Sequence, residues 1–101
     1  MKTVKQILIE ARELISDPRH WTTCAWARDE FGKSVGVSCG TAFCSVGAIE
    51  RAAGDWRLEK YAALDAFRRV VQCDYLPEFN DTHTHAEVLA AFTRAIEQCR
   101  E

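Results

Sequence analysis

Cys44 is the residue in this chain whose type and position best fit a chemical role. It begins the segment Cys44-Ser-Val-Gly-Ala-Ile49, which has helical character, and a thiol near a helix N-terminus can be activated as a thiolate. Asp81 and two histidines, His83 and His85, follow later in the chain and supply the other side chains of a cysteine nucleophile, base and orienter. The same thiol could instead be a small apolar filler where two helices touch, and we favour this interpretation because the chain after Cys44 leaves no room for a supporting sheet.

A zinc site is the second chemistry that these residue types allow. Cys39 and Cys44 with His83 and His85 would provide two thiolates and two imidazoles. Structural zinc sites usually contain a tight Cys-x-x-Cys pair, and the chain has none. On a helix, two cysteines five residues apart would also point in different directions. We therefore expect no cofactor and no metal, and we read Asn80 and Asp81 as side chains that tie an irregular loop to backbone groups, with Asp81 also able to cap the last helix.

Aromatic residues in or beside the irregular segments are candidates for protein binding. Tryptophan and tyrosine dominate binding hot spots, so exposed Trp56 and Tyr75 would be anchors, accompanied by a basic group on the third helix, Arg57, Arg68 and Arg69. Trp21 and Phe79 are predicted to cover the ends of a small core instead. The partner that these residues imply is another protein.

Helical periodicity predicts the elements that must position these residues. We expect helices over Lys5 to Ser16, Thr41 to Ala53 and Trp56 to Gln72, and a last helix that begins after Thr84. Capping boxes at Thr3 with Gln6 and at Thr84 with Glu87 mark the first and last helix starts, and Asp55 is the expected cap of the third helix. Small residues of the second helix, Gly47, Ala48 and Ala52, are expected to allow close helix contact.

Two segments lack helical periodicity. Between the first and second helices we expect a small β-hairpin or irregular segment, with strands near Trp21 to Arg28 and Ser34 to Ser38 and a turn at Asp29 to Gly32. Cys73 to His83 is expected to be irregular. The predicted fold is therefore a compact, mostly α, four-helix domain that forms a single unit over residues 1–101.

Composition excludes several function classes. The 101 residues are 48% hydrophobic and 28% charged with a net charge of −2, so a nucleic-acid partner is not expected. The apolar runs are too short to span a membrane, and no export signal is visible, which predicts a cytoplasmic protein. The five cysteines are an odd number and are expected to be reduced.

The order of motifs resembles a family of small uncharacterised bacterial and phage domains, domain of unknown function 6197. The resemblance covers nearly the whole chain and rests on Trp21 with Ala25-Trp-Ala-Arg-Asp29 and Gly32, on Phe43-Cys-Ser-Val-Gly-Ala-Ile49, on Phe79-Asn-Asp81 and on Ala86 to Ile96. This chain departs from the pattern by having Cys24 where a glycine is usual and no proline between Val35 and Cys39. The family implies a compact helical fold and no activity.

These observations favour a small non-enzymatic interaction or regulatory domain encoded by a phage or mobile element, for which an inhibitor of a host complex is one fitting role. Two alternatives stay open. One is a thiol-dependent enzyme that uses Cys44 with His83 or His85, and the other is a small zinc-stabilised domain.

Overall fold

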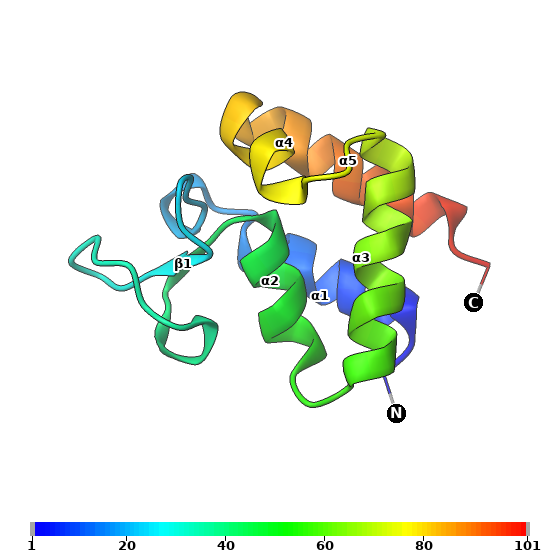
Figure 1. Cartoon of the computed structure of the whole chain (residues 1–101), viewed down its shortest axis with the longest axis horizontal. Helices are drawn as coiled ribbons and strands as arrows, with labels where there is room; N and C mark the ends of the chain where they lie inside the picture. Colours follow the sequence, from blue (N-terminus) through cyan, green and yellow to red (C-terminus); the bar gives the residue numbers. More distant parts are fainter. Residues whose placement is uncertain (1, 101) are drawn as a thin grey trace.

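Five α-helices and a two-stranded sheet make up the computed structural model, which describes residues 2–100 (Figure 1). The helices are α1 (Val4–Leu14), α2 (Ser45–Ala53), α3 (Arg57–Val71), α4 (Leu76–Thr82) and α5 (His85–Gln98). The strands are β1 (Ala27–Arg28) and β2 (Ala42–Phe43), and two short 3₁₀ helices are η1 (Pro18–His20) and η2 (Val37–Cys39). The mostly helical prediction is confirmed, but the number of helices differs by one.

The additional helix, α4, lies within the segment predicted to be irregular. It has seven residues, too few for helical periodicity to be visible, and Pro77 stands in its first turn. Proline is tolerated there because the first N–H groups of a helix have no intrahelical acceptor. Asn80 and Asp81 therefore lie on a helix and not in a loop.

Both predicted capping boxes are present. In α1, Gln6 N donates to Thr3 Oγ1 at 3.1 Å and Thr3 N donates to Gln6 Oε1 at 2.8 Å. In α5, Glu87 N donates to Thr84 Oγ1 at 3.1 Å and Thr84 N donates to Glu87 Oε1 at 2.8 Å. The predicted starts of both helices are therefore confirmed.

Other predicted boundaries are wrong where a distant partner decides them. The second helix begins at Ser45 and not at Thr41, because Ala42 and Phe43 pair with Arg28 and Ala27 in an antiparallel ladder. The predicted return strand at Ser34 to Ser38 is reduced to one bridge between Ser34 and Arg28, followed by η2. A small two-stranded antiparallel hairpin is therefore present, but its second strand is Ala42–Phe43. The predicted turn is confirmed, with Gly32 N bonded to Asp29 O at 3.0 Å and Gly32 at φ +81°.

The third helix starts at Arg57 with Trp56 as its N-cap, so the predicted Asp55 cap is wrong. Within α3, Asp65 and Arg69 form an ion pair one turn apart, with Arg69 Nη2 2.6 Å from Asp65 Oδ2. At the C-terminal end of α2, Gly54 is the C-cap and has φ +57°.

The core lies between α1 and the other long helices. Helix α1 packs against α2, α3 and α5, while the sheet and its loops project at the end of the molecule away from the C-terminus (Figure 1). Phe67 of α3 is fully buried and meets Phe79 of α4 and Phe92 of α5, with ring centroids 6.0 and 4.5 Å away. Within residues 2–100, no helix is both long enough and apolar enough to cross a bilayer.

Gly47 allows the backbone before β1 to pack closely against α2. A Cβ at this position would overlap the carbonyl oxygen of Trp26 and lie 2.8 Å from its carbonyl carbon. The expected close contact exists, but the group against Gly47 is the backbone that leads into β1 and not another helix.

Candidate functional site

The side chain of Asn80 is the polar centre where three parts of the chain meet. It is fully buried, and its Oδ1 accepts hydrogen bonds from Trp21 Nε1 at 2.8 Å and from Ser45 N at 3.0 Å. Its Nδ2 donates to Thr22 O at 3.0 Å. The side-chain amide of Asn80 therefore joins α4 to the loop after η1 and to the N-terminus of α2. Buried polar groups whose hydrogen bonds are all satisfied favour a single arrangement of the elements that they join.

Asp81 extends the same network to the surface. Its Oδ1 accepts from Cys24 N at 3.0 Å and from Asn80 Nδ2 at 3.1 Å. The prediction that Asn80 and Asp81 bond backbone groups is confirmed, but their own segment is helical and the loop that they hold is the one at Thr22 and Cys24. The alternative role of Asp81 as the cap of the last helix is wrong, because Thr84 is that cap.

Cys44 is the N-cap of α2 and is only 2% exposed. Its Sγ accepts from Gly47 N at 3.3 Å, and its own N–H donates to Trp26 O at 3.1 Å. Burial raises the pKa of the Cys44 thiol; the amides of Gly47 and Val46 oppose that rise, and the charge of Asp81 adds to it. A thiol held protonated at neutral pH is a poor nucleophile.

Each candidate histidine contacts a backbone carbonyl. His83 Nδ1 lies 2.8 Å from Phe79 O, and the His83 ring stacks on that of Phe79. His85 Nε2 lies 2.6 Å from Ile15 O, with its ring 5.4 Å from that of Trp21. Among the hydrogen bonds of residues 2–100, none joins either histidine to Cys44.

The structure does not bring together the four candidate zinc ligands. Cys39 is exposed in η2, whereas Cys44 is buried beneath Trp26. Within the described part of the chain, no three His, Cys, Asp or Glu side chains are placed to hold one metal ion.

Two aromatic side chains and α4 enclose a cavity of about 210 Å³ directly outside Cys44. We call this cavity the Trp26–Tyr75 pocket; it is lined by Cys24, Ala25, Trp26, Cys44, Tyr75, Pro77, Glu78 and Asp81. Trp26 and Tyr75 are 50% and 67% exposed, although the backbone at both residues is hydrogen-bonded. A fixed backbone that presents large aromatic side chains to solvent is typical of a binding surface.

Of the five predicted binding residues, only Tyr75 belongs to this pocket. Trp56 precedes α3 and Tyr75 follows it, so the length of α3 separates the two. Arg57 is exposed in the first turn of α3, Arg68 Nε donates to Asp74 O at 3.2 Å, and Arg69 pairs with Asp65. The other lining residues that were not predicted as site residues are Cys24, Ala25, Trp26, Pro77 and Glu78. The sequence pattern did not identify them because the pocket forms only where the loop before β1, the start of α2 and α4 meet in space.

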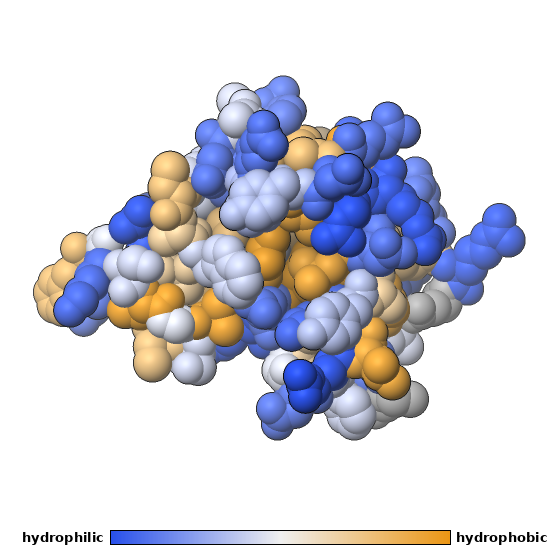
Figure 2. All heavy atoms as spheres, viewed as in Figure 1, coloured by the Kyte–Doolittle hydropathy of each residue, from blue (hydrophilic) through white to orange (hydrophobic). Residues whose placement is uncertain are grey.

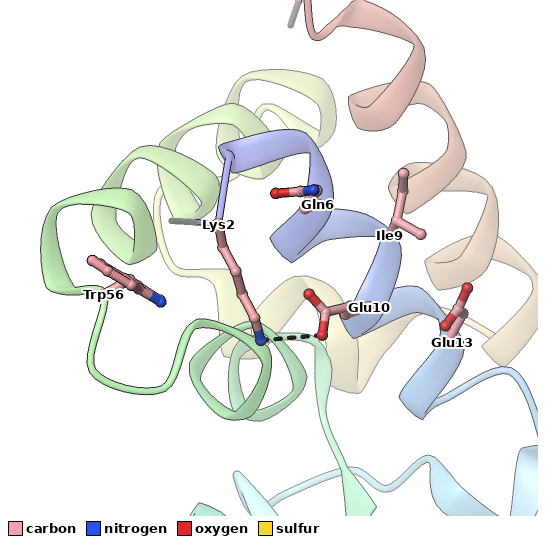
Figure 3. Close-up of a pocket in the computed structure, with 6 residues that line it drawn as sticks. All are labelled: Lys2, Gln6, Ile9, Glu10, Glu13 and Trp56. Carbon is pink, nitrogen blue, oxygen red and sulfur yellow. Dashed lines mark hydrogen bonds and ion pairs between the residues drawn. The ribbon is translucent and has the colours of Figure 1, made fainter.

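Trp56 lines a second, more open cavity of about 480 Å³ with Lys2, Gln6, Ile9, Glu10 and Glu13 (Figure 3). Lys2 crosses between Trp56 and α1, and its Nζ lies 3.1 Å from Glu10 Oε1 and 2.7 Å from Ala52 O. Lys2 thus satisfies a carbonyl of the last turn of α2, which gives this group of residues a role in holding α1 to α2.

The comparisons with known proteins identify a family and nothing further. A model of the Family of unknown function (DUF6197) matches residues 1–98. Neither the curated proteins nor the solved structures contain a match to the chain. The chain belongs to this family of unknown function.

Proposed function

We propose that this member of a family of unknown function is a protein-interaction domain and that the Trp26–Tyr75 pocket is its contact surface. The observation that carries the proposal is the position of Trp26 and Tyr75, half or more exposed around one cavity while their backbones are held by α2 and α4. Aromatic side chains on a rigid frame lose little conformational entropy on binding, which makes them effective anchors.

The roles of the reactive residues support the same proposal. Cys44 caps α2, Asp81 holds the loop at Cys24, and His85 binds the carbonyl of Ile15. Each of these side chains contributes to the fold around the pocket. The surface outside them is therefore the part of this region available to a partner.

Apolar surface on the face seen in Figure 2 is consistent with a protein partner. Figure 2 shows hydrophobic residues gathered between α2 and α3, in a hollow whose edges carry paler residues. Hydrophilic residues cover the neighbouring part of the same view. An apolar centre with a polar rim is the usual composition of a protein interface.

Site-specific photo-crosslinking tests the proposal. A benzophenone amino acid replaces Tyr75 in one variant and exposed Glu97 of α5 in a control variant, and both are irradiated in the cells that encode the protein. We expect one discrete adduct of higher mass from position 75 and none from position 97. Trp26→Ser combined with the probe at position 75 should remove the adduct. No adduct from position 75, or the same adducts from both positions, would contradict the proposal.

A further inference from the structure

Charge in the Trp26–Tyr75 pocket has one sign only. Glu78 and Asp81 stand one turn apart on α4, and none of the described residues that line the cavity is basic. Asp81 uses Oδ1 for its contacts with Cys24 and Asn80. Among the hydrogen bonds between residues 2 and 100, none engages Asp81 Oδ2 or the carboxylate of Glu78. The pocket thus offers acceptor oxygens to a positive group.

The basic side chains of the adjoining segments bond elsewhere. Arg28 donates to Gly32 O at 2.9 Å and to Thr23 O at 3.3 Å. Arg68, which bonds the carbonyl of Asp74, is also 3.8 Å from Asp65. Neither guanidinium neutralises the pocket carboxylates in the structure.

The aromatic and apolar residues that line the pocket also suit a bound cation. Trp26 and Tyr75 are both aromatic and both line the cavity. The π face of an aromatic ring attracts cations electrostatically, and an arginine guanidinium can stack on such a ring while it binds a carboxylate. Ala25, Pro77 and the neutral thiol of Cys44 form less polar surface that suits a methylene stem. The volume of about 210 Å³ is below the roughly 300 Å³ at which drug-sized ligand sites begin. A single side chain is therefore the fitting occupant.

We infer that the Trp26–Tyr75 pocket binds one arginine side chain of the partner protein. The inference rests on the proposed function and adds the chemistry by which the partner is recognised. Its guanidinium would lie between the two aromatic rings and the carboxylates of Glu78 and Asp81, with its stem against Ala25 and Pro77.

A titration with a model compound tests this assignment directly. N-acetyl-arginine methylamide is added to the isotope-labelled protein, and amide and indole shifts are followed by NMR. N-acetyl-citrulline methylamide, which has nearly the same shape without the charge, is the matched control. We expect saturable shifts confined to residues of the pocket and to the Trp26 indole, with binding of the arginine compound about fivefold tighter than that of citrulline.

Two charge variants separate the pocket from general electrostatics. Glu78→Gln removes a carboxylate that makes no hydrogen bond to any other described residue, so the fold should persist, as checked by the melting temperature. It should weaken arginine binding about threefold to fivefold. Glu97→Gln on α5 makes the same change in net charge and should leave the affinity unchanged.

Three results would overturn the assignment: equal affinity for arginine and citrulline, equal effects of Glu78→Gln and Glu97→Gln, or tighter binding of tetramethylammonium, which would indicate a small organic cation. The crosslinking experiment distinguishes the two proposals. An adduct from position 75 without arginine binding would support the interaction domain and contradict the arginine ligand. Arginine binding without an adduct would contradict the proposal that the ligand belongs to a partner protein.

Discussion

Cys24 occupies a backbone conformation that disfavours side chains with a Cβ. Its φ of +62° lies in the left-handed region, and its N–H is held by Asp81 at 3.0 Å. The left-handed region costs a residue with a Cβ about 1–2 kcal/mol, which explains why a glycine suits this position of the family pattern.

We therefore expect Cys24→Gly to raise the free energy of unfolding by about 0.5 kcal/mol, after the greater entropy of an unfolded glycine is subtracted. Denaturant unfolding measures the change. The control Cys39→Gly, at an exposed cysteine with ordinary backbone, should lower stability instead. An equal loss in both variants would show that the left-handed backbone at Cys24 is not strained.

The thiol of Cys44 should be inert in the folded protein. Its burial and its raised pKa both reduce attack on iodoacetamide. We expect Cys24 and Cys39, which are exposed, to be alkylated first, and Cys44 to react only after denaturation. Peptide mass mapping at increasing times checks the order. Native modification of Cys44 as fast as that of Cys24 would contradict it and would favour the thiol-dependent enzyme.

Helix α2 and the backbone of β1 are in contact at Gly47. Gly47→Ala places a methyl group on the Trp26 carbonyl, so we expect destabilisation of at least about 1–3 kcal/mol by overpacking. Gly36→Ala is the matched control because, apart from Gly36 itself and its two chain neighbours, no atom of the described residues lies within 4 Å of the added Cβ. Melting temperatures of the two variants measure the difference. If both behave alike, the contact at Gly47 is not tight.

The capping box of α5 predicts a pH dependence of stability. The amide of Thr84 holds the pKa of Glu87 below its usual range. A carboxyl whose pKa is lower in the folded state stabilises the fold above its ordinary pKa of about 4.3, and this contribution is lost as the pH falls through the lowered value. Glu87→Gln keeps a hydrogen-bonding side chain in the box but cannot titrate.

The difference in unfolding free energy between the native protein and Glu87→Gln should therefore be largest near neutral pH and should shrink in acid. Urea unfolding at several pH values between 7 and 3 measures it. A difference that stays constant over this range would show that the charge of Glu87 does not contribute.

Elements whose signals are local could be predicted from the sequence, and elements fixed by distant contacts could not. Thr3 and Thr84 mark helix starts through residues three positions away. By contrast, the start of α2 depends on a strand pairing with Ala27 and Arg28, and α4 is too short to show periodicity. For the candidate site, the sequence indicated that Asn80 and Asp81 hydrogen-bond to backbone groups. It did not indicate which groups, because their partners Trp21, Ser45 and Cys24 lie 35 to 59 residues away.

The whole molecule depends on one core that joins α3, α4 and α5 through Phe67. Removal of a buried phenylalanine typically costs about 3–5 kcal/mol, a large fraction of the 5–15 kcal/mol by which most domains are stable. We expect Phe67→Ala to show this loss and Leu58→Ala, at a side chain 81% exposed on the same helix, to stay within about 0.5 kcal/mol of the native protein. Denaturant unfolding measures both. Equal losses of unfolding free energy in the two variants would show that Phe67 is not central to the core.

The bond from Trp21 to Asn80 also has a consequence for the order of events during synthesis. The two residues are 59 positions apart, so the loop around Trp21 leaves the ribosome long before its partner exists. At about 5–20 residues per second, that interval is roughly 3 to 12 s. Throughout it, the indole of Trp21 and the backbone N–H of Cys24 lack the α4 side chains that later hold this loop. The pocket, which this loop helps to form, is therefore completed only after α4 has been synthesised.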